Sequence, residues 1–91
     1  MEEFEYTDSV YLLVSNNIKK YRKIKNLTQA TLAEKTDLSH EFIRRIESKK
    51  GYKSFSINTV CKIALVLKIP IEAFFTDERG VIINENKRKY F

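Results

Sequence analysis

The segment from Thr28 to Glu47, TQATLAEKTDLSHEFIRRIE, constrains the fold of this 91-residue chain more than any other segment. Thr28 is a favourable N-cap for a first short helix, whose buried side is supplied by Leu32 and Ala33. The chain must then reverse at Asp37, and aspartate is one of the few non-glycine residues that adopt a left-handed conformation. The pattern therefore predicts a short helix followed by a tight turn.

A second short helix is predicted to begin after the turn, with Ser39 as its N-cap. Ile43 and Ile46 are three residues apart and are expected to point inward, with Leu38 behind them. The side chains left on the outward face are polar and long: His40, Glu41, Arg44 and Arg45. This second helix should therefore present a charged surface to solvent.

Length and composition indicate one small globular domain, since 43% of the residues are hydrophobic and 32% are charged. The longest uninterrupted apolar runs, Val10–Val14 and Ile63–Leu67, are far too short to cross a membrane, and no signal-peptide pattern opens the chain. We therefore expect a cytoplasmic protein that does not bind a membrane. The single cysteine, Cys61, falls within an apolar helical pattern and is expected to be a buried small hydrophobe with no redox role.

Catalytic and metal-binding functions lack the residues that they need. The chain has one histidine, no His/Cys cluster with metal-ligand spacing and no glycine-rich phosphate loop, and its carboxylates are scattered. We therefore expect no enzyme activity, no metal and no other cofactor, and no small-molecule ligand is implied.

The positive charge of the chain is unevenly distributed. The net charge is +5, but residues 1–15 contain four acidic residues and no basic one, so all 17 Lys and Arg lie in residues 16–91. A basic body of this size suits a polyanion such as the DNA backbone, although solvated lysine-rich surfaces are also common. Charge supports a nucleic-acid partner only in combination with the helical motif.

The N-terminal part of the chain divides near Asp8. Residues 1–7 show no helical pattern and are predicted to be an acidic arm, either extended or disordered. Beyond them, apolar residues recur at steps of three and four, which predicts an amphipathic helix that ends near Lys25. Asn26 would follow that helix in the left-handed conformation.

The C-terminal part is expected to contain two more helices. Ser56 should cap the first of them, and Pro70 should open a short last helix over residues 71–75. The first of these helices is expected to bury a broad apolar face formed by Ile57, Val60, Cys61, Ala64, Leu65 and Leu67. The apolar surface of Ile71, Phe74 and Phe75 exceeds what so small a helix can bury in one domain, which suggests a dimer interface. Residues 76–91 are expected to form a C-terminal tail with a strand-like run at residues 81–83 and a basic end, and this tail is a further candidate for a role in dimerisation.

The central segment resembles the helix-turn-helix of the Xre/Cro-like repressor family. The residues that carry the resemblance are Gln29, Leu32, Ala33, Leu38, Ser39, Ile43, Ile46 and Glu47. The family usually has glycine where this chain has Asp37, a departure that adds about 1 kcal/mol of strain to the turn. The resemblance runs from Asn17 to Phe75 and implies an all-α, compact five-helix repressor-like DNA-binding domain over residues 8–75.

The resemblance also implies roles for individual residues. Arg22 would form an ion pair with Glu47 and so fix how the second helix of the motif leans on the first helix of the domain. Phosphate contacts are expected from Gln29, Ser39, Lys49, Lys50 and Lys53, with solvation as the alternative for the lysines.

Contacts to DNA bases are expected from the outward face of the second motif helix, at His40, Glu41, Phe42, Arg44 and Arg45. Arg45 is the favoured reader of guanine and Arg44 the alternative. Glu41 would accept a hydrogen bond from cytosine, or would simply complement the helix N-terminus. Phe42 would pack on a thymine methyl group if exposed and would belong to the core if buried.

Two functions are consistent with these features. The favoured one is a transcriptional regulator that binds double-stranded DNA as a homodimer at an operator with two half-sites, as in small phage repressors and restriction-modification controller proteins. The alternative is an antitoxin whose main partner is another protein and which also binds its own promoter. A further expectation is that residues 1–8 and the tail pair as a short two-stranded β-sheet, since their patterns and charges are complementary.

Overall fold

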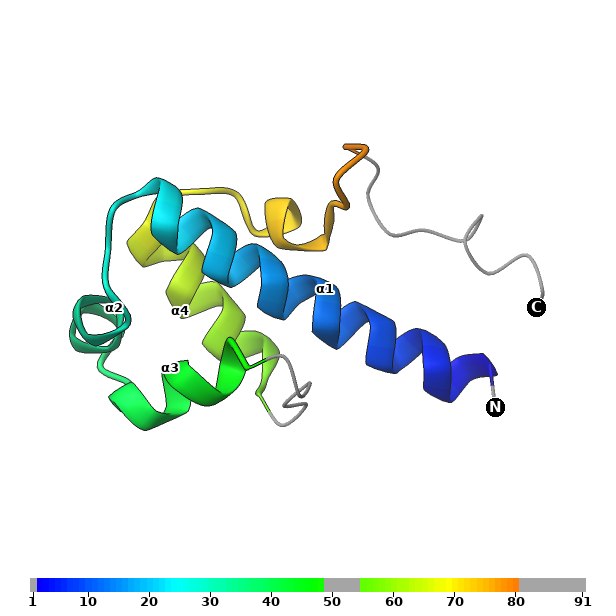
Figure 1. Ribbon diagram of the computed structural model, residues 1–91, viewed down its shortest axis with the longest axis horizontal. Helices are drawn as coiled ribbons and strands as arrows, with labels where there is room; N and C mark the ends of the chain where they lie inside the picture. Colours follow the sequence, from blue (N-terminus) through cyan, green and yellow to red (C-terminus); the bar gives the residue numbers. More distant parts are fainter. Residues whose placement is uncertain (1, 49–54, 81–91) are drawn as a thin grey trace.

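A computed structural model describes residues 2–48 and 55–80, with backbone only for residues 2–9. The elements in chain order are α1 (Glu2–Ile24), α2 (Gln29–Thr36), α3 (His40–Ile46), α4 (Ile57–Leu67) and a 3-10 helix, η1 (Ile71–Phe75). Helices α2 and α3 form one end of the molecule, and α4 runs alongside the C-terminal half of α1 (Figure 1). All regular secondary structure in the described residues is helical, as expected. The count of five helices is not confirmed, because the last element is a single short 3-10 helix.

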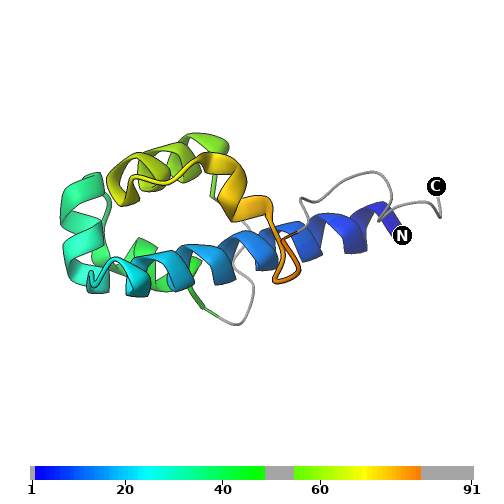
Figure 2. The same cartoon turned by 90° about the horizontal axis from the view of Figure 1, so that it is seen from above.

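Helix α1 begins six residues earlier than the sequence pattern indicated. It includes residues 2–7, so the prediction of a non-helical acidic arm is wrong, and the predicted sheet between residues 1–8 and the tail is wrong for its first strand. The strand-like run predicted at residues 81–83 lies outside the described residues. Glutamate is a good helix former, and acidic residues near a helix N-terminus interact favourably with the helix dipole, which accounts for the helical start. The first turns of α1 extend past the end of α4 in both views (Figures 1 and 2).

The end of α1 follows the expected local rule. Asn26 adopts the left-handed conformation with a φ of 62°, and the Leu27 amide donates to the Arg22 carbonyl at 3.0 Å. This arrangement is a Schellman-type cap, which satisfies a carbonyl that the helix leaves unpaired. The chain can therefore turn sharply into α2.

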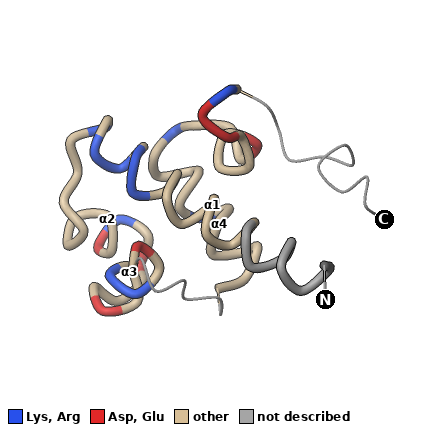
Figure 3. The backbone as a smooth tube through the Cα atoms, turned by 45° about the vertical axis from the view of Figure 1, so that its right-hand side comes forward, with Lys and Arg blue, Asp and Glu red and all other residues tan. Residues whose placement is uncertain are grey.

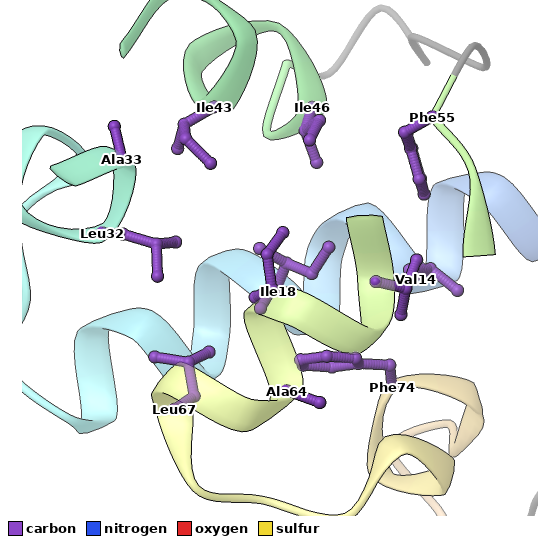
Figure 4. Packing of buried hydrophobic residues seen from close by; sticks show 12 residues of the cluster. Val14, Ile18, Leu32, Ala33, Ile43, Ile46, Phe55, Ala64, Leu67 and Phe74 are labelled. Carbon is purple, nitrogen blue, oxygen red and sulfur yellow. The ribbon is translucent and has the colours of Figure 1, made fainter. Parts of the chain in front are cut away.

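The core lies between α1 and the other helices (Figure 4). Ile18 of α1, Leu32 of α2, Ile43 of α3 and Ile63 of α4 are all fully buried. Each helix of the described chain therefore contributes apolar surface to one continuous cluster.

Element η1 is held against α1 by apolar packing and by one buried amide. Phe74 is fully buried, and its ring packs edge to face with Tyr21 at 6.2 Å between centroids. The Asn17 amide donates to the Phe74 carbonyl at 2.8 Å and to the Thr76 carbonyl at 3.0 Å. These bonds satisfy backbone groups that the short element leaves unpaired.

The buried side of α4 differs from the expected one. Val60, Ile63, Ala64 and Leu67 face the core, whereas Ile57 is 62% exposed and Leu65 is 78% exposed. Cys61 is also exposed, so the prediction that it is a buried hydrophobe is wrong. The helix has more apolar positions than one packing face can cover, and part of them must therefore remain on the surface.

Within the described part of the chain, no helix is both long and apolar enough to cross a membrane. The same residues contain no group of three or more potential His, Cys, Asp or Glu metal ligands.

Candidate nucleic-acid interface

The helix-turn-helix is bounded by a side-chain cap at the start of each helix and has one left-handed residue in its turn, as predicted. The Thr28 hydroxyl accepts from the Thr31 amide at 3.0 Å, and the Ser39 hydroxyl accepts from the Phe42 amide at 3.0 Å. Between them, Asp37 has a φ of 62° and a ψ of 32°. The Leu38 amide then donates to the Ala33 carbonyl at 3.0 Å, which closes the end of α2.

Apolar packing fixes which side of each motif helix faces outward. Leu32 and Ala33 of α2 and Ile43 and Ile46 of α3 are buried and converge above α1 (Figure 4). Helix α3 has seven residues, too few to be stable alone, so its orientation depends on these contacts.

A buried ion pair ties the C-terminal end of α3 to α1. Arg22 donates from Nε to Oε2 of Glu47 at 2.7 Å and from Nη2 to Oε1 at 2.9 Å, which is a bidentate geometry. The Arg22 side chain is 9% exposed and that of Glu47 is 1% exposed. Arg22 also donates from Nη1 to the Leu27 carbonyl at 2.6 Å. The residues paired through the family resemblance are thus in direct contact.

Helix α2 joins the same network through Gln29. Its side-chain Nε2 donates to Oε1 of Glu47 at 3.0 Å, so one carboxylate contacts side chains from both α1 and α2. This contact was not anticipated from the sequence. It places Gln29 at the N-terminus of α2 with its amide nitrogen directed at Glu47.

The outward face of α3 carries exposed charged side chains. His40, Glu41, Arg44 and Arg45 are all exposed, whereas Phe42 is half-buried and packs partly against the core. Arg44 donates to Oε1 of Glu41, and Arg45 Nε lies 3.4 Å from Oε2 of the same carboxylate. The hydrogen bond from Arg44 and the positive charge of both arginines lower the pKa of Glu41 below its ordinary value.

Basic residues lie on three helices near this end of the molecule, and α2 contributes Lys35. Figure 3 shows lysine and arginine along the last turns of α1 and again on α3. The Ser39 hydroxyl, a predicted phosphate ligand, is engaged as the N-cap of α3. Lys49, Lys50 and Lys53, the other predicted phosphate ligands, lie outside the described residues.

The predicted dimer residues do not form one exposed surface. Phe74 is buried in its own chain and cannot contact a partner in this conformation, so its assignment to an interface is corrected. Helices α1 and α4 both pack on η1, so they bury more of its apolar surface than the short length of this element indicated. Ile71 and Phe75 are half-buried. Leu65 and Ile57 of α4 are the large apolar side chains most exposed in the described residues, and sequence reasoning placed both in the core.

Comparison with known proteins agrees with this geometry. A family model for helix-turn-helix proteins, HTH_3, matches residues 18–74 and thus more than half of the chain. No curated protein and no solved structure gives a significant match to the chain. The matched range contains α2, the turn at Asp37, α3 and the ion-paired Arg22. The chain therefore belongs to the Xre/Cro-like helix-turn-helix family of DNA-binding transcription regulators.

Proposed function

We propose that this protein is a sequence-specific regulator that binds double-stranded DNA as a homodimer, with one α3 helix in each of two operator half-sites. The observation that carries the proposal is the division of α3 into two sides. Ile43, Ile46 and Glu47 hold one side in the core, while Arg44 and Arg45 stand exposed on the other. A short helix with a fixed inner side and exposed arginines suits insertion into the major groove.

Base recognition is assigned chiefly to Arg45, with Arg44 as the alternative. An arginine can donate two hydrogen bonds to O6 and N7 of guanine, which is the commonest specific contact in the major groove. His40 lies in the first turn of α3 and is exposed, so it belongs to the same candidate set. Phe42 is half-buried, and its remaining exposed surface suits a thymine methyl group or a sugar.

Phosphate contacts are assigned to the flanks of the motif. Helix α2 would lie across the DNA backbone. Gln29 is the first residue of α2 and Ser39 is the N-cap of α3, so both residues are at helix N-termini. The buried pair of Arg22 and Glu47 would act as a positioning device, because it sets the inclination of α3 against α1.

A second copy of the chain is assigned to the exposed apolar face of α4. Leu65 protrudes beside a shallow hollow of about 450 Å³ that is lined by Cys61, Leu65, Lys68, Ile69 and Ile71, among others. A two-fold dimer uses the same patch on both subunits, so a protruding side chain next to a hollow is self-complementary. This face retains Ile71 from the predicted interface and replaces Phe74 with Leu65.

The test of DNA binding is selection of bound duplexes from a random pool. A two-fold symmetric consensus for the wild-type protein supports the proposal, and recovery of no consensus would refute it. Arg45→Ala should relax the base preference at one base pair per half-site. It should also weaken binding to the consensus duplex by about 1–3 kcal/mol. Arg79→Ala is the matched control, because Arg79 is also exposed and ion-paired but lies beyond η1, outside the helix-turn-helix.

The test of the dimer is sedimentation equilibrium of Leu65→Lys. Burial of a leucine contributes about 1.5–3 kcal/mol and two copies are buried per dimer, so the dissociation constant should rise at least 100-fold. Leu12→Lys on α1 introduces the same charge at an exposed leucine outside this face and should leave dimerisation unchanged. An unaltered dimer in Leu65→Lys would exclude the α4 face. Co-purification of an unrelated small protein in place of a dimer would favour the antitoxin function.

A further inference from the structure

One acidic side chain on α3 contacts both arginines that are proposed to contact DNA. Glu41 is three residues before Arg44 and four before Arg45, so all three side chains lie on the same side of the helix. The two carboxylate oxygens are divided between the arginines: Oε1 accepts from Arg44 Nη2, and Oε2 lies 3.4 Å from Arg45 Nε. All three side chains are more than half exposed to solvent.

This cluster of Glu41, Arg44 and Arg45 is expected to contribute little to the stability of the fold. Ion pairs between exposed side chains on a helix stabilise it only slightly, and two long arginine side chains lose conformational freedom when they are held by one carboxylate. The cluster has a stronger effect on the charge that α3 offers to DNA. Glu41 offsets part of the positive charge of Arg44 and Arg45, and its oxygens take the position that a phosphate oxygen would take beside either guanidinium.

We propose that Glu41 determines specificity by competing with DNA phosphates for Arg44 and Arg45, and not by contacting a base. This inference rests on the proposed DNA-binding function and assigns Glu41 a role in it. In a non-specific complex, binding depends almost entirely on neutralisation of phosphates by Lys and Arg. The carboxylate weakens such complexes, because it keeps two arginines partly neutralised and repels the phosphates itself.

The specific complex is affected less by the same carboxylate. The contact between Glu41 Oε2 and Arg45 lies at Nε, so it restrains the guanidinium from one edge. A restrained guanidinium loses less conformational freedom when it binds two guanine acceptors, which offsets part of the repulsion. Glu41 thus positions Arg45 at the operator and weakens binding to other DNA sequences.

The decisive variant is Glu41→Gln, which keeps the size of the side chain and one of its two acceptor oxygens but removes the charge. Glu34→Gln is the matched control, because Glu34 is an exposed glutamate on α2 and the change in net charge is identical. Affinity is measured for the duplex selected by the wild-type protein and for a scrambled duplex of equal length, each over a series of KCl concentrations. Urea unfolding of each variant reports whether the fold is retained.

Glu41→Gln should bind the scrambled duplex about tenfold more tightly than the wild-type protein does at moderate salt. Its affinity for the operator should rise by a smaller factor. The slope of log affinity against log salt on the scrambled duplex should steepen by up to about 2, because two arginines become available to phosphates. Glu34→Gln should change both affinities by the same small factor.

Two results would overturn the inference. One is a Glu41→Gln protein whose affinity and salt slope on the scrambled duplex match those of Glu34→Gln. The other is loss of preference at a single base pair with unchanged non-specific binding, which would make Glu41 a base-contacting residue. Failure of the wild-type protein to bind either duplex would instead refute the proposed function and this inference with it.

Discussion

The buried pair of Arg22 and Glu47 allows a quantitative prediction about the Glu47→Gln variant. The Glu47 carboxylate accepts hydrogen bonds from Nε and Nη2 of Arg22 and from Nε2 of Gln29, with only 1% of the side chain exposed. Glutamine has one acceptor oxygen in place of two and brings an NH₂ group that would face donors of Arg22 or Gln29. The substitution therefore leaves a buried cation without its counter-charge.

Removal of one partner from a buried ion pair costs about 3–5 kcal/mol. The lower end applies here, because Arg22 keeps its 2.6 Å bond to the Leu27 carbonyl and retains slight solvent contact. A loss of about 3 kcal/mol is a large part of the 5–14 kcal/mol expected for a domain of this size. The midpoint of thermal unfolding should fall by roughly 12–24 °C.

Urea unfolding followed by circular dichroism, without DNA and at one fixed protein concentration, measures the effect, since both DNA binding and dimerisation add apparent stability. Glu34→Gln is the control and should change the free energy of unfolding by less than about 0.5 kcal/mol. A loss below about 1 kcal/mol in Glu47→Gln would refute the view that the pair braces α3. The double variant Arg22→Met, Glu47→Leu should be more stable than Glu47→Gln and still bind DNA weakly, because the charges are gone but the geometry is not restored.

Three further substitutions test the turn, the C-terminal element and the flank of the motif. Asp37→Gly should raise the free energy of unfolding by up to about 1 kcal/mol in urea, because glycine adopts the left-handed conformation without strain; a loss of stability would contradict this. Asn17→Ala leaves two backbone carbonyls of η1 and its C-cap without their donor and should cost about 2–4 kcal/mol, with faster amide exchange confined to that element; uniform exchange would argue against a local role. Gln29→Ala should lower the affinity for the operator and for the scrambled duplex alike, as measured by filter binding. A loss of affinity restricted to the operator would contradict a phosphate contact.

The helix-turn-helix was predictable because its boundaries depend on local chemistry. Thr28 and Ser39 act as N-caps, and Asp37 adopts the left-handed conformation that the turn requires. Each of these features depends on a side chain and the backbone within three residues of it, so the sequence contains the necessary information. The outward face of α3 followed directly from the burial of Ile43 and Ile46.

The rotation of α4 could not be predicted in the same way. Apolar residues occur nearly all around this helix, so periodicity does not identify the side that packs on α1. The structure buries Ile63 and exposes Leu65 and Cys61, which the pattern had placed together in the core. The consequence for function is direct, because the exposed side becomes the candidate dimer face.

The start of α1 was missed for a different reason. Residues 2–7 have no apolar periodicity, and the alternation of Phe4 and Tyr6 with acidic residues is compatible with a strand that pairs with the tail. Helix propensity and the favourable placement of acidic residues at a helix N-terminus outweighed that weak alternation.

Gln29 illustrates a related limit: its bond to Glu47 joins residues 18 apart in sequence, and no local pattern predicts such a contact.

The contacts that hold α3 explain how DNA recognition can vary on a constant fold. The helix is fixed at its start by the Ser39 cap, in its middle by Ile43 and Ile46, and at its end by the ion pair of Glu47. All of these anchors are at the ends of the helix or on its inner side, so the exposed outer side chains contribute little to folding. Substitutions at the outer positions should therefore change which DNA sequence is bound while the stability of the domain stays nearly constant. The cluster around Glu41 follows from this freedom, because an acidic residue beside two arginines weakens DNA attraction without disturbing any contact that the fold needs.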